Sequence, residues 1–330
     1  MKKRILTGDR TTGKLHLGHY IGSLKSRVAL QESYDTFIIL ADVQALTTHF
    51  KEPSKINEGI YDVAIDNLAV GLKPEEVTIF QQSQVKAIAE LTIFYSMFVS
   101  VNSLRHNPTI KTEAMQYGYE DLTYGFLGYP VSQAADITFC NADLIPVGGD
   151  QLPHIEQTRK IIRRFNDLYG DGQNVLTIPE ALLSETPRLP GVDGNAKMGK
   201  SLGNAIYLSD EPEVVGQKIK MTKTDTNRLR LTDRGNPDIC TVATYHRAFN
   251  STESATIGEM CRNASIGCST CKGVLSQVIN ETLKPIQDRR HYYDTHRHVV
   301  REIIMTGTDR ANIIGDVMVE EVKEAMKLKI

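Results

Sequence analysis

Short apolar runs alternate with longer amphipathic stretches over the first two thirds of the chain. The runs Lys3–Gly8, Thr36–Asp42 and Glu76–Phe80 are rich in β-branched or aromatic residues, and a helix-length stretch separates each from the next. In Ile56–Leu72 the apolar residues recur at helical spacing. Strands that are apolar on both faces and alternate with helices are typical of a parallel sheet covered by helices. The pattern therefore predicts an α/β domain.

The same alternation continues to about residue 206, where the character of the chain changes. Val131–Cys140 and Leu152–Leu168 have helical spacing, and Leu144–Gly149 between them resembles a strand that ends in a glycine turn. Asn204–Leu208 is the last predicted strand, and Ser209–Pro212 predicts a helix start because a capping residue precedes an early proline. Nearly everything beyond it has helical period. We therefore expect an α/β region followed by an α-helical one.

Composition narrows the class of protein without identifying it. The 330 residues are 41% hydrophobic and 24% charged, with a formal net charge of -2, which excludes a collagen, a mucin-like stalk and a globally disordered chain. No apolar run approaches the roughly 18–20 residues of a membrane span. The basic start Met1–Arg4 is not followed by the apolar core of a secretory signal. We therefore expect a soluble, cytoplasmic protein that makes no membrane contact and keeps its cysteines reduced.

A glycine-containing turn follows the first predicted strand. Gly8–Lys14 has the spacing of a P-loop, but that motif continues with a Ser or Thr that binds Mg²⁺, and Leu15 stands there instead. We therefore do not interpret the turn as a P-loop. His16-Leu17-Gly18-His19 comes next, at a predicted helix start, where imidazoles can donate hydrogen bonds to phosphate oxygens. From this motif alone, a pair of surface histidines near a turn is an equal alternative.

A second motif lies about 180 residues further along the chain. Lys197-Met198-Gly199-Lys200-Ser201 belongs to a glycine-rich loop that begins at Gly191. Two lysines there can neutralise a departing pyrophosphate, and a mobile loop can close over a nucleotide. Together the two motifs are identified as the paired signature of class I aminoacyl-tRNA synthetases, with Gly199 where that family usually has Ser.

The resemblance extends along essentially the whole chain. Gly8–Tyr20 is similar to the opening of bacterial tryptophanyl-tRNA synthetases, Tyr129–Ile137 resembles their amino-acid helix, and Pro146–Gln151 resembles their nucleotide-contacting turn. The resemblance implies a Rossmann-like parallel-sheet catalytic domain over residues 1–205, with inserted dimerisation and amino-acid-binding helices, and an α-helical tRNA anticodon-binding domain over 206–330. It also implies a homodimer that uses L-tryptophan, tRNA(Trp) and ATP with Mg²⁺.

Asp136 is the residue that bears on the choice of amino acid. In the family that it resembles, the carboxylate at this position accepts the indole N–H, and the resemblance places further tryptophan contacts at Tyr129, Gln133, Gln151 and Gly8. A tyrosine hydroxyl could also donate to a carboxylate, so a tyrosine–tRNA ligase is the closest alternative; the Gln133–Asp136 context favours tryptophan. A catalytically silent paralogue that binds tRNA or senses redox state is a third alternative, although the nucleotide-binding residues are all present.

The resemblance also implies how the nucleotide is held. The catalytic residues would be His16 and His19 on the phosphates, and Lys197 and Lys200 on the developing charge of the leaving group. The residues of the ATP site would be Arg10, Thr11, Thr12, Gly18, His19, Gly148, Gly149, Asp150, Leu189, Lys197, Met198, Gly199, Lys200 and Ser201. Of these, Asp150 would hydrogen-bond the ribose.

Four of the five cysteines lie in the last third of the chain. Cys240, Cys261, Cys268 and Cys271 are spaced C-x20-C-x6-C-x2-C, and four thiolates suit Zn²⁺ or an iron–sulfur cluster. The alternative is a set of buried small hydrophobic residues. A subset of tryptophanyl-tRNA synthetases carries four cysteines here with the same two short intervals, so the resemblance favours a [4Fe–4S] cluster over zinc.

Two stretches are basic enough to suit a polyanion. Their basic residues are Arg159, Lys160, Arg163 and Arg164 in the first, and Lys284, Arg289, Arg290, Arg297 and Arg301 in the second. Such a stretch is more often a solvated helix face than a binding site, but in a synthetase we expect tRNA contacts there.

Overall fold

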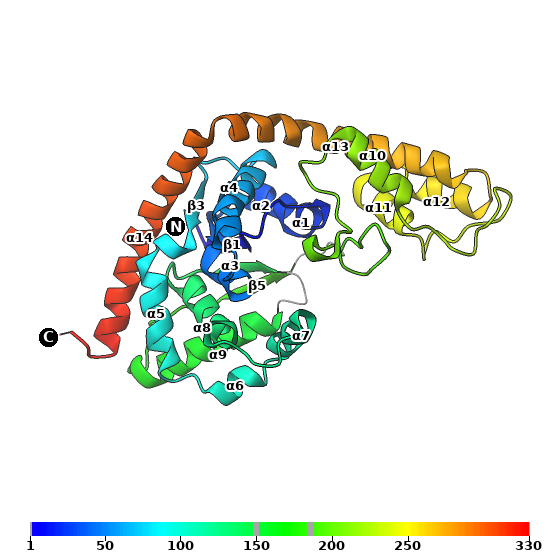
Figure 1. The fold of residues 1–330 in the computed structure, drawn as a ribbon. Helices are drawn as coiled ribbons and strands as arrows, with labels where there is room; N and C mark the ends of the chain where they lie inside the picture. Colours follow the sequence, from blue (N-terminus) through cyan, green and yellow to red (C-terminus); the bar gives the residue numbers. More distant parts are fainter. Residues whose placement is uncertain (1, 148–151, 184–187, 330) are drawn as a thin grey trace.

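A five-stranded parallel sheet forms the centre of the molecule. The computed structural model describes residues 2–147, 152–183 and 188–329 (Figure 1). The strands are β1 (Arg4–Arg10), β2 (Asp35–Ala41), β3 (Val77–Gln81), β4 (Leu144–Val147) and β5 (Glu180–Leu183), and their order in the sheet is β3-β2-β1-β4-β5. All four strand pairs are parallel. The predicted α/β class is therefore confirmed, and the first three predicted strands coincide with β1–β3 to within two residues.

Helices cover both faces of this sheet and continue beyond it. Those before residue 200 are α1 (Leu17–His19), α2 (Lys25–Leu30), α3 (Asp42–His49), α4 (Pro53–Ala69), α5 (Lys86–Ser96), α6 (Val101–Arg105), α7 (Pro108–Tyr117), α8 (Tyr124–Thr138) and α9 (Leu152–Tyr169), with a π-helical turn at Tyr20–Leu24. Those after it are α10 (Pro212–Met221), α11 (Thr241–Phe249), α12 (Ser254–Arg262), α13 (Cys268–Thr295) and α14 (Arg297–Ala325). The structure contains no helix that is both long and apolar enough to cross a membrane, among the described residues.

One predicted strand is wrong. Asn204–Leu208 is not part of the sheet; it pairs as a short antiparallel bridge with the segment before α1, where the Leu17 amide donates to the carbonyl of Ile206 (2.9 Å). Its apolar residues are buried against that segment. The apolar pattern therefore resulted from burial and not from pairing within the sheet. The fifth strand, β5, was missed because its sequence Glu-Ala-Leu-Leu contains no β-branched residue.

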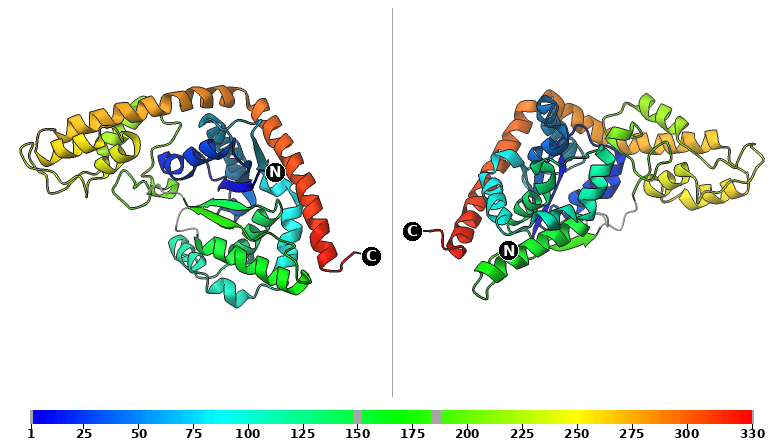
Figure 2. Two further views of the ribbon diagram at one scale, coloured as in Figure 1. Left: turned by 180° about the vertical axis from the view of Figure 1, so that it is seen from behind. Right: turned by 60° about the horizontal axis from the view of Figure 1, so that its bottom comes forward.

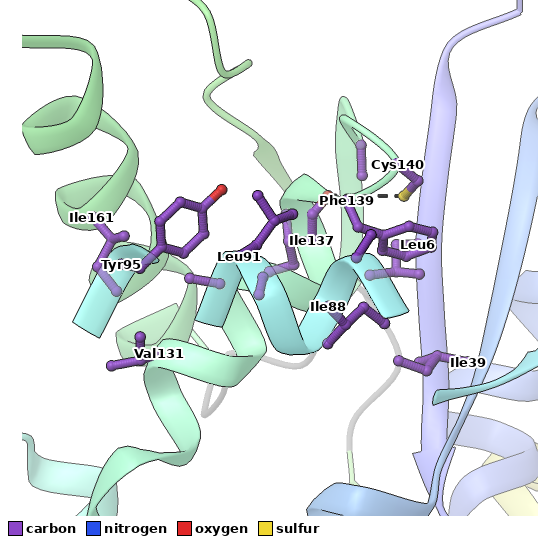
Figure 3. Close-up of a cluster of buried hydrophobic side chains, with 14 of the residues drawn as sticks. Leu6, Ile39, Ile88, Leu91, Tyr95, Val131, Ile137, Phe139, Cys140 and Ile161 are labelled. Atoms are coloured by element: carbon purple, nitrogen blue, oxygen red, sulfur yellow. Dashed lines mark hydrogen bonds between the residues drawn. The ribbon is translucent and has the colours of Figure 1, made fainter. Parts of the chain in front are cut away.

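Alternate residues of the central strand β2 enter opposite cores. Phe37 and Ile39 join a cluster with α5, α8 and α9, whose packing is drawn in Figure 3. Ile38 and Leu40 join a second cluster with α4 and α13. A strand that is buried on both faces reads as a continuous apolar run, which is why β2 was recognisable in the sequence.

The last helix returns to the sheet. In Figures 1 and 2, α13 runs from the group α10–α12 to the sheet, and α14 then descends alongside β3 and α5. The backbone of α14 comes so close that a Cβ on Gly307 would lie 2.0 Å from the carbonyl oxygen of Ile79. Met318 and Val322 of α14 belong to the same core as Phe37. Helix α14 therefore covers the edge strand of the sheet, which would otherwise be open to pairing.

Candidate active site

The two histidines of the first motif hold each other in place at the start of α1. The ring Nδ1 of His16 accepts a hydrogen bond from the Gly18 amide (3.1 Å), and the Nδ1 of His19 accepts one from the His16 amide (3.2 Å). Because each Nδ1 accepts, the proton of each neutral ring is on Nε2. Burial lowers the pKa of His16 to about 2 and that of His19 to about 4. Both rings are therefore neutral hydrogen-bond donors at pH 7.

A buried ion pair lies behind these histidines. Asp9 at the end of β1 pairs with Arg27 of α2 (2.6 Å), and Arg27 also donates to Asn67 of α4 (2.9 Å). Burial opposes the ionisation of Asp9, but the Arg27 charge outweighs it and lowers the pKa of Asp9 to about 2. Asp9 therefore stays ionised, and its charge also acts on His19 and Lys200. Sequence reasoning missed this pair, because nothing in the local pattern around Arg27 marks it as buried.

The lysine loop is folded down onto the turn after β1. Lys200 donates through Nζ to the carbonyl of Gly13 (2.5 Å) and lies 3.5 Å from the hydroxyl of Thr12. Burial lowers the pKa of Lys200, although Asp9 acts in the opposite direction. The first lysine of the motif, Lys197, is exposed. The structure therefore joins the two sequence motifs directly through Lys200, whereas the side chain of Lys197 is open to solvent.

A buried asparagine, Asn204, holds the backbone of the lysine loop by hydrogen bonds. Asn204 accepts from the Gly199 amide (2.9 Å) and donates to the Lys197 carbonyl (3.2 Å). Met198 is buried, and its amide donates to the carbonyl of Leu189 (3.3 Å), so both of these predicted ATP-site residues support the loop. The role of Asn204 was missed, because its segment was interpreted as a strand.

One face of α8 carries the predicted amino-acid contacts. Tyr129, Gln133 and Asp136 are four and three residues apart, so they lie along one side of the helix. Tyr129 and Asp136 are buried, and Gln133 is half-buried. Asp136 accepts a hydrogen bond from Gln82 (2.7 Å), and burial raises the pKa of Asp136 to about 7. The guanidinium of Arg10 lies over the Tyr129 ring, 5.7 Å from its centroid, and connects this face to the turn after β1.

Several predicted site residues have a different status. Gly148, Gly149, Asp150 and Gln151 lie outside the described residues, as does the side chain of Ser201. Gly8 lies in β1, where a Cβ would come within 2.1 Å of the Ile39 carbonyl oxygen, so strand packing itself requires glycine there. Leu15, which stands where a P-loop has Ser or Thr, is fully buried.

The four clustered cysteines gather at the ends of helices. Cys240 precedes α11, Cys261 lies in α12, and Cys268 and Cys271 are in the first turn of α13. Burial and the other three thiols together raise the pKa of Cys271 to about 12. Within the described ranges, however, no group of three or more His, Cys, Asp or Glu side chains is arranged to hold a metal ion. The thiols are neighbours, but they do not enclose an ion.

The two basic stretches differ in their surroundings. On α9, Lys160, Arg163 and Arg164 are exposed. On α13, Arg290 is buried and bonds Asp66 (2.8 Å) and Asp62 (2.9 Å) of α4. Asp66 also accepts from the Leu15 amide (2.7 Å), so this arginine supports the segment that carries the histidines. Part of the second stretch is therefore structural.

A parallel sheet whose first strand leads into paired histidines, under a loop that carries two lysines, defines a class I aminoacyl-tRNA synthetase. The family model described as tRNA synthetases class I (W and Y) matches residues 1–284, and the chain belongs to this family.

Similar proteins extend this result. The chain is 46% identical over 335 residues to a tryptophan–tRNA ligase of Streptococcus mutans, covering 98% of both chains. It is 45% identical over 337 residues to a tryptophan–tRNA ligase of Streptococcus pneumoniae, covering 99% of this chain and 98% of the relative. Among solved structures, the tryptophanyl-tRNA synthetase of Campylobacter jejuni complexed with ADP and tryptophan has a TM-score of 0.87 and 26% identity, covering 98% of this chain and 99% of that one.

Proposed function

We propose that the chain is a tryptophan–tRNA ligase, which activates L-tryptophan with ATP and transfers it to tRNA(Trp). The observation that carries the proposal is the buried Asp136 on the face of α8 that it shares with Tyr129 and Gln133. A buried carboxylate with one engaged oxygen selects a ring that can donate a hydrogen bond to the other. The family and the names of its similar full-length relatives support the same amino acid.

The geometry favours catalysis by positioning and charge rather than through a covalent enzyme intermediate. The tryptophan carboxylate oxygen forms a bond to the α-phosphorus as the bond to the bridging oxygen of pyrophosphate breaks, and pyrophosphate leaves with the electron pair. The Nε2–H groups of His16 and His19 donate to phosphate oxygens. Lys197 and Lys200 neutralise the charge that develops on the leaving group. Mg²⁺ bound with ATP would supply further charge neutralisation. A ribose hydroxyl at the 3′ end of tRNA then forms an ester bond to the tryptophanyl carbonyl carbon as the bond to AMP breaks, and AMP leaves with the electron pair.

Pyrophosphate exchange into ATP tests this assignment. The full-length protein is expected to exchange in the presence of tryptophan and not of tyrosine. Exchange with tyrosine alone would instead support a tyrosine–tRNA ligase. Absence of exchange with either amino acid would support the silent paralogue. Lys200→Ala tests the role of the half-buried lysine of the loop and should lower kcat for tryptophan by at least 10-fold.

The remaining partners follow from the same proposal. Residues 206–330 would bind the tRNA anticodon, residues 1–205 would carry the catalytic domain with its inserted helices, and the enzyme would act as a homodimer. The exposed Lys160, Arg163 and Arg164 on α9 suit contact with the tRNA backbone. Sedimentation equilibrium tests the dimer, and tRNA binding at increasing salt tests the basic face.

We further propose that Cys240, Cys261, Cys268 and Cys271 hold a [4Fe–4S] cluster, with Zn²⁺ as the alternative. The four thiols are the right donor set for either, and burial together with the neighbouring thiols raises the pKa of Cys261 and of Cys271. Their present arrangement does not enclose an ion, so ligation would require the helix ends to move together. Iron, sulfide and zinc analysis of anaerobically purified protein distinguishes the two, and absence of all three would leave structural thiols.

A further inference from the structure

Gln82 is a buried side chain that connects two elements of the amino-acid site. It lies in the short 3-10 helix Gln82–Gln84, directly after β3, and is only 2% exposed. Its Oε1 accepts a hydrogen bond from the backbone amide of Gln44 in α3 (3.1 Å), and its Nε2 donates to Oδ1 of Asp136 (2.7 Å). A backbone amide can only donate, so the orientation of the Gln82 amide is determined by Gln44. The NH₂ group therefore has to face Asp136.

The neighbouring carboxylate of Asp42 accepts hydrogen bonds at both of its oxygens. Asp42 receives hydrogen bonds from Gln81 Nε2 (2.8 Å), from the Ser83 hydroxyl (2.6 Å) and amide (2.9 Å), and from the Val43 amide (2.9 Å). Asp136, by contrast, receives a bond only from Gln82 within the described part of the chain. Gln81 and Ser83, on either side of Gln82, thus donate to Asp42, whereas Gln82 donates to one oxygen of Asp136, whose other oxygen accepts no hydrogen bond from the described residues.

We propose that Gln82 is a specificity-determining positioning residue, which keeps Oδ1 of Asp136 an acceptor and leaves Oδ2 for the ring N–H of the substrate. The inference rests on the proposed tryptophan activity. Its physical basis is that an NH₂ group stabilises an ionised oxygen and cannot accept a proton from an acid. Without Gln82, a buried Asp136 would protonate more readily, and a protonated acid does not select for a donor ring.

The charges around Asp136 agree with this role. Burial raises the pKa of Asp136, the hydrogen bond from Gln82 lowers it, and the charge of Asp42 raises it again. The thiol of Cys140 is a further titratable group close enough to interact with Asp136. Among these groups, Gln82 is the one that favours the carboxylate.

The test uses the full-length protein and two amino acids that differ only at the ring donor. Tryptophan is compared with 3-benzothienyl-L-alanine, in which sulfur replaces the indole N–H, in the pyrophosphate-exchange assay. Gln82→Met keeps the length of the side chain and removes its donor. We expect the ratio of kcat/KM for tryptophan over the sulfur analogue to fall at least 10-fold, while KM for ATP stays unchanged. Gln81→Met is the matched control, because Gln81 donates to Asp42 instead, and it should preserve the ratio.

Three other results have defined consequences. Loss of activity on both amino acids in equal proportion would overturn the inference, because it would mean that Gln82 is only structural. Wild-type protein that activates no tryptophan would overturn the proposed function and this inference with it. If Gln82→Met does not fold, Gln82→Glu is used instead, because its carboxylate still accepts a hydrogen bond from the Gln44 amide. We expect kcat/KM of this variant for tryptophan to reach its plateau at a pH at least one unit higher than in the wild type. An unshifted pH profile would overturn the inference.

Discussion

At the scale of single residues, the site is a set of buried polar groups whose protonation is controlled by their surroundings. His16 and His19 are neutral because burial removes the stabilisation that water gives to an imidazolium ion. Asp9 stays ionised because Arg27 is in direct contact with it. Asp136 lacks a cation partner among the described residues, and burial raises its pKa to about 7. Of the two acids, Asp136 is thus the one whose ionised form is less stabilised.

Asp136→Asn should lower activity toward tryptophan and raise the stability of the folded protein at pH 8. Removal of a charged hydrogen-bond acceptor is expected to lower kcat/KM for tryptophan by roughly 10- to 100-fold. A pKa raised from 3.8 to about 7 means that the folded state loses stability as the pH rises between these values. The variant should therefore unfold at higher urea than wild type at pH 8, and the difference should vanish near pH 4. A pH-independent difference would contradict this account.

At the scale of elements, two close contacts attach the C-terminal helices to the rest of the molecule. The backbone of α14 lies against β3 at Gly307, and α13 is joined to α4 through Arg290 and Asp66. The second contact continues to the Leu15 amide, which begins the histidine segment. A helix distant in sequence therefore supports the segment that carries His16 and His19.

Gly307→Ala should destabilise the protein, because its new Cβ would meet the backbone of Ile79 at 2.0 Å. Overpacking against a strand that cannot move aside costs about 1–3 kcal/mol. Gly273→Ala in α13 is the matched control: no atom lies within 4 Å of its Cβ position, so the helix should gain about 0.5–1 kcal/mol. Urea unfolding of both variants measures these changes, and equal effects would contradict the contact.

Arg290→Gln should affect both stability and nucleotide binding. The change leaves Asp66 buried without its cation, which costs about 3–5 kcal/mol of unfolding free energy. KM for ATP should rise as well, since Asp66 also binds the Leu15 amide. Arg297→Gln removes an exposed ion pair with Asp294 and should change stability by less than about 0.5 kcal/mol. Unfolding curves and ATP titrations of the exchange reaction provide the measurements; an unchanged KM would refute the link to the nucleotide site.

At the scale of the whole molecule, the C-terminal helix α14 packs against the sheet formed by the N-terminal part of the chain. Helix α14 comes last in the sequence, yet it supplies Ala311, Met318 and Val319 to the core that includes the sheet. Deletion of residues 297–330 should therefore prevent cooperative folding of the sheet region. Deletion of residues 328–330 alone should leave the unfolding midpoint within about 2 °C of wild type. Circular dichroism with thermal unfolding compares the two, and a cooperative transition in the longer deletion would contradict the prediction.

Local patterns were sufficient for much of the fold and for the two motifs. β1–β3 were recognisable because each contains a short run of buried residues between helix-length stretches, and His16 and Lys200 were recognisable because each belongs to a contiguous motif. Asn204 and β5 were misjudged because burial and pairing depend on neighbours that the local sequence does not contain.

What the sequence by itself determined is therefore the α/β order of elements and the paired motifs of a class I synthetase, and it predicted Asp136 as the selective acid. Only the tertiary structure decided which groups touch them. Gln82 lies 54 positions from Asp136, and Arg290 lies 224 positions from Asp66. The physical reason is that pKa, amide orientation and loop position are determined by contacts in space, whereas sequence periodicity reports only which face of an element is buried.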